Sequence, residues 1–222
     1  MTTTTTTPTL GSVLRWTKDI GMFAIDRSRE ESCVHRSEFC NQTCFNIKLE
    51  RAFAHTIGPK DAKNDIAWSQ NDTVSLVKTL KAKRRQTSRA RLMTRGEAFK
   101  DLADIARVEA ILTATPDVAW WVPTRAWRSP IIWLAIQGLI SRNANIKVLA
   151  SVDPSDDADM VQAIEDSGAS TMFYGDDSAL KSANGSRRFK CPKTHAHLNG
   201  HCAICKAGCF ADKQVHVHLA QH

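Results

Sequence analysis

The sequence has no long apolar run. The longest one, Pro130 to Ile140, spans eleven residues and contains a glutamine. Because a helix needs about 20 apolar residues to cross a bilayer, this stretch predicts a buried helix and not a membrane span. The N-terminal sequence MTTTTTTPTLG has no basic segment followed by an apolar one, so it does not have the pattern of a secretory signal. We therefore expect a cytoplasmic protein without a membrane partner.

Several catalytic motifs are also missing. The chain contains no G-x-S-x-G, no H-E-x-x-H and no Walker sequence, which disfavours the hydrolases and nucleotide-binding proteins that use them. The run from Lys78 to Arg95 has eight basic residues but no acidic and no aromatic residue, and the whole chain carries a net charge of +7. The run is either a solvated helix face and loop or a patch for nucleic acid. Without aromatic side chains it offers no base stacking.

Cysteine is absent between Phe45 and Lys190, and the seven cysteines form two groups on either side of this gap. The first group is Cys33, Cys40 and Cys44, and the second is Cys191, Cys202, Cys205 and Cys209. In a reducing compartment, clustered cysteines are more often metal ligands than disulfides. The distribution therefore predicts two metal-binding segments, which form one site or two.

Short apolar segments alternate with amphipathic ones along the middle of the chain. The segments 21–27, 90–94, 117–122, 146–152 and 170–175 are typical of strands, and 66–83, 98–113, 130–141 and 156–167 are typical of helices. Such alternation predicts an α/β fold, as a partial (β/α) barrel or an open, doubly wound parallel sheet. We expect a disordered tail over residues 1–10, this α/β unit over 11–178, and a small Cys/His-rich metal-binding element over 179–222.

Polar residues follow several of the predicted strands. The candidates are Gly96 and Glu97 after the second strand, Thr124 and Arg125 after the third, and Ser151 and Asp153 at the end of the fourth, together with the first cysteine group. Because the carboxyl ends of parallel strands meet at one edge of a sheet, we expect these residues to converge there. Individually, Glu97 is also suited to a helix first turn, and Arg125 to an anion clamp or a solvated loop.

The second cysteine group has the pattern C-x10-C-x2-C-x3-C. Four thiolates within nineteen residues are enough for tetrahedral zinc or for an iron–sulfur cluster. The pattern does not choose between these metals. Mixed Cys/His zinc is open as well, because the same segment holds His195, His197, His201, His216, His218 and His222.

The first cysteine group has the pattern C-x6-C-x3-C and supplies only three ligands. A closed structural zinc site needs four ligands, whereas a site with an open position is suited to chemistry. Three interpretations remain: a [4Fe–4S] cluster with one iron free to bind a substrate, a zinc site completed by His35 or another ligand, and thiols with a structural or reactive role.

Four segments carry a resemblance to a known family. They are CNQTCFNIK (40–48), RLMTRGEAF (91–99), TPDVAWWVPTRAW (115–127) and the cysteine block of 191–222. Together they resemble a family of phage and plasmid proteins of the "gene product eighty-eight" type, whose layout is similar to that of radical S-adenosylmethionine (SAM) enzymes.

The resemblance implies roles for the predicted site residues. Cys33, Cys40 and Cys44 would hold the [4Fe–4S] cluster, although radical SAM enzymes usually space these cysteines as C-x3-C-x2-C. Gly96 and Glu97 would hold the amino group of SAM, Ser151 or Asp153 would reach its ribose, and the second cysteine group would hold an auxiliary cluster. We expect an iron–sulfur protein acting on an unknown substrate, possible classes being nucleic acid and peptide. The alternative is a non-catalytic, zinc-stapled protein that binds nucleic acid or a host protein through Lys78–Arg95.

Overall fold

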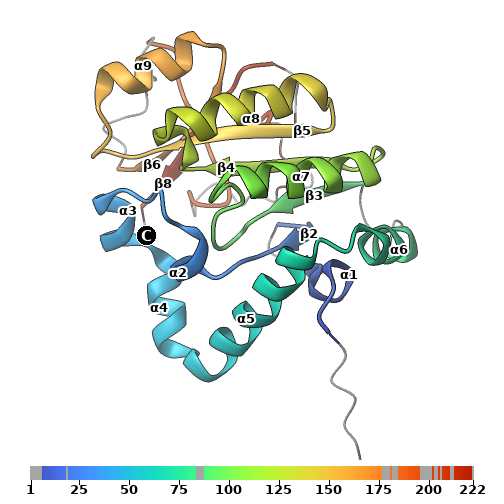
Figure 1. Cartoon of the computed structure of the whole chain (residues 1–222). Helices are drawn as coiled ribbons and strands as arrows, with labels where there is room; N and C mark the ends of the chain where they lie inside the picture. Colours follow the sequence, from blue (N-terminus) through green and yellow to red (C-terminus); the bar gives the residue numbers. More distant parts are fainter. Residues whose placement is uncertain are drawn as a thin grey trace, which may run out of the picture.

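The computed structural model describes residues 7–18, 20–83, 88–176, 181, 185–195, 202, 205, 207–210 and 213–221. Its centre is an eight-stranded sheet with the order β1-β2-β3-β4-β5-β6-β8-β7 (Figure 1). Neighbouring strands are parallel except β1, which runs antiparallel to β2. The strands are β1 (Arg15–Thr17), β2 (Met22–Ile25), β3 (Arg89–Leu92), β4 (Ala119–Thr124), β5 (Ile146–Val152), β6 (Ser170–Gly175), β7 (Phe189–Lys190) and β8 (His216–Ala220).

Helices fill most of the connections between the strands. They are α1 (Leu10–Val13), α2 (Arg29–Ser32), α3 (Glu38–Thr43), α4 (Phe45–Ala52), α5 (Ala54–Gln70), α6 (Thr73–Lys83), α7 (Leu102–Ala114), α8 (Pro130–Arg142) and α9 (Ala158–Asp166), with a 3-10 turn over Ala126–Arg128. The helix predicted over 66–83 is interrupted, because Asn71 adopts a left-handed conformation that ends α5. Asp72 then accepts the amide of Ser75 in the first turn of α6.

The predicted strands are close to the observed ones. β5 and β6 have the predicted bounds, and β2 lies within the predicted segment. The strand predicted over 117–122 is too short, because β4 continues through Pro123 to Thr124, and these two residues pair with Leu149 and Ala150 of β5. Proline lacks only the amide hydrogen, so its carbonyl and its neighbours still contribute to a ladder.

The two faces of the sheet pack against different parts of the chain. Side chains alternate along a strand, so the neighbours Trp120 and Trp121 belong to different clusters. The cluster of Trp120 holds the apolar sides of α5 to α9, including Trp68, Val108 and Ile136. The cluster of Trp121 is smaller and packs against Cys191, Cys202 and Cys209 of the C-terminal segment. Helices therefore cover one face and the C-terminal cysteines cover the other.

The order of the strands and the side on which the helices lie can be compared with the two predicted architectures. From β2 to β6 the strands follow one another in sequence order, and the helices of their crossovers pack in one cluster. In Figure 1, α7 and α8 lie side by side over the strands. A doubly wound sheet would carry helices on both faces. The fold is a mixed α/β fold with a mostly parallel sheet, and the described strands form an open sheet without barrel closure.

The C-terminal segment shares this sheet. β8 pairs with β6, beginning with Thr171 opposite His216 and ending with Gly175 opposite Ala220. β7 pairs with the other side of β8 and forms the edge of the sheet. The predicted small element of residues 179–222 is therefore joined to the α/β unit through backbone pairing. Residues 1–6 of the predicted disordered tail lie outside the described residues, while Thr9 caps α1. No helix in the described part of the chain is long and apolar enough to cross a membrane.

Candidate functional site

The first cysteine group follows β2 on three short helices. Cys33 ends α2, Cys40 lies in α3, and Cys44 separates α3 from α4. Serine hydroxyls fix the starts of two of these helices: Ser28 accepts the amide of Glu31, and Ser37 accepts the amide of Cys40 at 3.0 Å. These caps fold the cysteine loop locally and place its three half-buried thiols at the carboxyl end of the sheet.

The three thiols lie close enough to influence one another. Burial, together with the charges of Glu97, Cys40 and Cys44, raises the pKa of Cys33 to about 12. Burial also raises the pKa of Cys40, with Arg125 opposing this effect and Cys44 adding to it. The metal-free thiols of Cys33 and Cys40 are therefore protonated at neutral pH, and a bound cation would displace those protons.

Glu97 lies beneath the cysteine loop with its carboxylate enclosed by donors. It accepts the amides of Ala98 and Phe99, the hydroxyl of Thr124 at 2.8 Å and the amide of Arg125 at 2.9 Å. Oε1 accepts three of these hydrogen bonds and Oε2 accepts one, so Oε2 can accept a further hydrogen bond. Glu97 thus joins the ends of β3 and β4. α7 begins at Leu102, later than the predicted residue 98, because Asp101 caps the helix by accepting the amide of Asp104.

Gly96 is a position at which only glycine fits. Its φ is +80°, and a Cβ there would lie 2.8 Å from the carbonyl oxygen of Arg27 and from the hydroxyl oxygen of Ser32. Ser32 donates from that hydroxyl to the carbonyl of Ser28 and accepts the amide of Glu97. The turn after β3 is therefore packed directly against the segment that carries Cys33.

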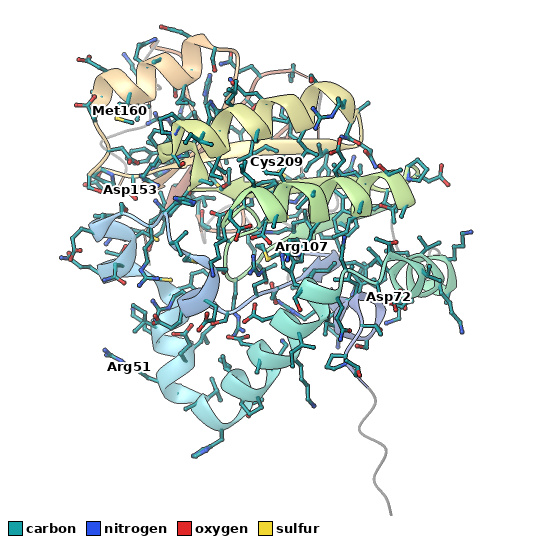
Figure 2. The ribbon with its side chains drawn as sticks, in the orientation of Figure 1. Arg51, Asp72, Arg107, Asp153, Met160 and Cys209 are labelled. Carbon is teal, nitrogen blue, oxygen red and sulfur yellow. The ribbon has the colours of Figure 1, made fainter. Side chains whose placement is uncertain are left out.

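Asp153, after β5, is the second enclosed carboxylate of the site. It accepts the hydroxyls of Ser37 and Ser155 and forms ion pairs with Arg125 and, at 3.4 Å, with Arg128. Burial would raise its pKa, but these partners together lower the pKa below the ordinary value. Figure 2 shows Asp153 between the α3 segment and the strands. Its ionised carboxylate therefore anchors both the cysteine loop and two arginines.

The predicted site residues thus converge as expected at the carboxyl ends of the strands, with one exception. Thr124, Arg125, Glu97 and Asp153 share direct contacts, whereas Ser151 enters the network only through its carbonyl, which accepts the indole N–H of Trp127 at 2.7 Å. Sequence reasoning missed Ser37 and Arg128. The spacing of Arg125 and Arg128 in PTRAWR is the signal that could have indicated a second cation.

A buried carboxylate behind the site was also missed. Asp26 follows β2 and accepts the side chain of Arg15 and, from the turn after β3, the hydroxyl of Thr94 and the amides of Thr94 and Arg95. Burial opposes ionisation of Asp26, yet Arg15 and the hydrogen bonds lower its pKa. Asp26 therefore fixes the β3 turn that carries Gly96 and Glu97.

An open cleft of about 970 Å³ lies beside Cys44. It is lined by residues of α2, α3, α4 and α5 and by Gln221: Arg29, Glu30, Asn41, Gln42, Thr43, Cys44, Ile47, Lys48, Glu50, Arg51, Ala54 and Gln221. Arg29 is paired with Glu30 and Glu50 inside it. The volume is that of a small-molecule or segment-binding site, and it opens next to one of the three thiols.

The second cysteine group gathers on the other face of the sheet. Burial, together with the charges of Cys191 and Cys205, raises the pKa of Cys202 to about 11. Cys209 has a pKa raised to about 12 by burial and then by Cys191, Cys205 and Cys202. All four cysteines therefore lie near one another. Of the histidines considered as extra ligands, His197, His201 and His222 lie outside the described residues.

The basic run Lys78–Arg95 does not form a single exposed patch in the described part of the chain. Lys78, Lys81 and Lys83 lie on α6, residues 84–87 are outside the described residues, and the remaining arginines point into the structure. Arg95 is buried and paired with Asp61, and Arg91 lies on the ring of Trp121 at 4.4 Å. A nucleic-acid partner stays a prediction, which now rests on the lysines of α6.

In the described part of the chain, no group of three or more His, Cys, Asp or Glu side chains is arranged so that it could hold a metal ion. The predictions of iron–sulfur and zinc at the two cysteine groups are therefore not supported by the arrangement of these residues. His35 contacts the carbonyl of Lys100 through Nε2 at 3.0 Å. The metal sites stay predictions that depend on the chemistry of the thiols.

Comparison with known proteins gives one match. No curated protein and no solved structure is significantly similar to the chain. Residues 1–215 match the sequence model of the family described as Gene product 88, which covers the sheet as far as Val215 and both cysteine groups. The resemblance in the cysteine, RLMTRGEAF and PTR segments is thus confirmed, and the chain belongs to the Gene product 88 family.

Proposed function

We propose that this chain is an iron–sulfur protein with a radical-SAM-like site. Cys33, Cys40 and Cys44 would hold a [4Fe–4S] cluster with one iron open, and the second cysteine group would hold a second metal centre. The single observation that carries the proposal is the meeting of three thiols with Glu97, Arg125 and Asp153 at the carboxyl ends of parallel strands. In folds of this type, this edge is where ligands bind.

The donor set suits an iron–sulfur cluster. Thiolates are the ligands such clusters take, and the three cysteines sit on a loop whose caps and tether keep them together. Arg125 and Arg128 face Cys40 and favour negative charge there. A terminal nitrogen of Arg128, Nη1, is buried without an acceptor in the described part of the chain. The site therefore offers cationic donors to an anionic cluster or to a carboxylate bound beside it.

Glu97 and Asp153 take different roles in this proposal. The free position on Oε2 of Glu97 is available to an ammonium group, such as that of SAM. The oxygens of Asp153 are already occupied by serine and arginine donors, so we assign Asp153 a positioning role in place of the predicted contact with a ribose. The cluster would supply one electron to the bound ligand, and the cleft beside Cys44 would take the substrate.

The test is anaerobic reconstitution with iron and sulfide, followed by metal analysis, absorption and electron paramagnetic resonance. A triple variant, C33A/C40A/C44A, should lose about half of the bound iron and keep the rest, whereas C191A/C202A/C205A/C209A should lose the complementary part. SAM is then titrated into the reconstituted wild type and the triple variant. Protein without iron after reconstitution, or iron content unchanged in the triple variant, would refute the proposal.

One observation favours a second candidate. Cys191, Cys202 and Cys209 pack under the apolar face of the sheet like a structural staple, which is the environment in which closed four-cysteine zinc sites occur. In that case both groups would hold zinc, and the α6 lysines would contact nucleic acid. A colourless protein with stoichiometric zinc, whose RNA or DNA binding weakens with salt, would favour this candidate.

A further inference from the structure

A pair of helices leads away from the candidate site. α4 begins after Cys44 and meets α5 at Phe53, and Figure 1 shows both helices apart from the layer of α7, α8 and α9. The start of α4 borders the cleft of about 970 Å³, which Gln221, the residue after β8, also lines. The surface of α4 is therefore continuous with the cleft at the carboxyl ends of the strands.

Three large apolar side chains are exposed along α4. Phe45, Leu49 and Phe53 follow one another at intervals of four residues, which places them on the same side of the helix and at its end. Their exposed fractions are 47%, 36% and 58%. Single exposed apolar residues are common on protein surfaces, whereas a row of neighbouring ones marks an interaction site. The row therefore indicates that α4 binds a partner.

The exposed charges around this row all have the same sign. In the segment 45–64, the exposed charged residues are Lys48, Arg51 and Lys63. The acidic residues of the segment do not offset them, because Glu50 is paired with Arg29 and Asp61 is buried. Figure 2 shows Arg51 on the outer side of α4, away from the sheet. The partner that this charge attracts is therefore an anion.

Cations beside exposed aromatic rings fit single-stranded nucleic acid. Lysine and arginine neutralise its phosphates, and aromatic rings stack on its unpaired bases. On α4, Phe45 and Phe53 provide the rings, and Lys48 and Arg51 provide the cations. The basic run Lys78–Arg95 lacks this combination, because it contains no aromatic residue.

The lining of the cleft favours a nucleic acid over an anionic membrane, which would also match the charges. Asn41, Gln42 and Gln221 line the cleft, and their amide groups both donate to and accept from the edges of unpaired bases. A bilayer surface is too broad to enter a cleft, whereas a single strand can pass from the rings of α4 into it. A nucleotide in the cleft would lie beside Cys44.

We infer that α4 and the adjoining cleft bind single-stranded nucleic acid, with Phe45 and Phe53 stacking on bases and Lys48 and Arg51 neutralising phosphates. The inference deepens the proposed function, because it names the substrate class of the cleft, and as a statement about a substrate it rests on that function. The binding itself needs no metal. It moves the nucleic-acid surface from the basic run Lys78–Arg95 to the helix that follows Cys44.

The experiment measures binding of fluorescent oligonucleotides of about 12 nucleotides to the full-length, metal-free chain by anisotropy. Oligo-dT and oligo-U are the single-stranded probes. F45A and F53A should each weaken binding about 5- to 100-fold, because one stacked base is lost, whereas F45W and F53W should keep the affinity. K48Q/R51Q should reduce the slope of log affinity against log salt concentration by about 1.4. Circular dichroism checks that each variant is folded.

Two control variants are matched to these changes. F189A removes a phenylalanine of similar exposure, 44%, from β7, and K78Q/K81Q removes two exposed lysines from α6. Both should bind the oligonucleotides as the wild type does. Wild-type affinity in F45A and F53A, or a loss confined to K78Q/K81Q, would overturn the inference. Binding of phosphatidylserine vesicles without binding of either oligonucleotide would overturn it in favour of a membrane.

The iron content after reconstitution is measured separately on the same wild-type protein. A chain that takes up iron but binds no oligonucleotide would overturn this inference and leave the proposed function standing. A chain that binds the oligonucleotides through α4 but takes up no iron would refute the proposed function and leave the binding surface standing.

Discussion

The hydroxyl of Ser37 donates a hydrogen bond to Asp153 Oδ2 at 2.5 Å, which ties the cysteine loop after β2 to the end of β5. The same serine caps α3 by accepting the amide of Cys40. The side chain of Ser37 therefore fixes the start of the helix that carries Cys40. It also holds this helix beside Asp153, which pairs with Arg125 and Arg128 and lies 116 residues away in the sequence.

Replacing Ser37 tests this tether. S37A removes a helix cap and a charge-assisted hydrogen bond, so we expect a loss of about 1 to 2 kcal/mol in the free energy of unfolding and lower iron occupancy after reconstitution. Denaturant unfolding and iron analysis measure the two effects. S69A is the control, because Ser69 is exposed on α5 and donates only to the carbonyl of Ile66. If S37A is destabilised but binds as much iron as the wild type, then Ser37 stabilises the fold through its helix cap and is not needed to hold the metal site.

Gly96 and Gly168 form a matched pair for the turn after β3. Both have a positive φ, +80° and +84°, but a Cβ at Gly168 meets open space whereas a Cβ at Gly96 meets Arg27 and Ser32. G168A should therefore show only backbone strain, about 1 kcal/mol. G96A should lose about 1 to 3 kcal/mol more and perturb the cysteine loop. Thermal and denaturant unfolding measure the difference, and equal losses would contradict the close packing.

Arg125 favours the charged form of the Cys40 thiol. Burial raises the pKa of Cys40 and Arg125 opposes that rise, so R125Q should raise this pKa further. Alkylation of metal-free protein, followed by mass spectrometry across a pH series, measures the change as slower labelling of Cys40 at a given pH. R142Q, on the exposed pair with Glu109, should leave the Cys40 profile unchanged. Faster labelling of Cys40 in R125Q would show that the arginine shields the thiol and does not act through its charge.

The thiol of Cys33 should be unreactive in the metal-free, folded protein. Its pKa of about 12 leaves very little thiolate at pH 8, and only the thiolate attacks an alkylating reagent. We expect its labelling rate to rise about tenfold per pH unit through the alkaline range, and to rise sharply on unfolding at constant pH. Rapid labelling of Cys33 in folded protein at pH 7 would contradict the burial and the effect of Glu97.

Asp26 should make stability depend on pH in the acid range. Its pKa in the folded protein lies below the ordinary value of 3.8, so its contribution is present above that value and is lost as the pH falls through the lower, folded pKa. D26N leaves Arg15 without its carboxylate partner and should cost about 3 kcal/mol at pH 7. The gap between wild type and D26N should narrow in acid, as followed by denaturant unfolding at several pH values. E109Q, at an exposed pair, should change little at any pH.

Much of the fold could be read from local patterns. The alternation of apolar and amphipathic segments predicted β2 to β6 and α7 to α9, because the residues that bury a strand or one side of a helix repeat with fixed periods. The short elements were missed. α2 and α3 contain four and six residues, and their starts depend on the serine caps of the loop and not on apolar periodicity.

The candidate site could be predicted in part for a topological reason. The carboxyl ends of consecutive parallel strands must share an edge, which was enough to bring the first cysteine group, Glu97, Arg125 and Asp153 together before any contact was known. The partners within the site could not be predicted. Ser37 and Arg128 are ordinary loop and turn residues in the sequence, and only the fold places them on Asp153.

The sequence by itself determined the membership in the Gene product 88 family, the alternation of β3 to β6 with α7 to α9, and the grouping of cysteines at both ends of the chain. The tertiary structure decided which face each group occupies. β8 pairs beside β6, so the second cysteine group lies on the face opposite the helices, and the guanidinium of Arg91 lies over Trp121 on that same face. The sequence places Arg91 in a run of basic residues because the charge of an arginine does not depend on the fold. Its surroundings and its contacts are set only when the strands of the sheet come together.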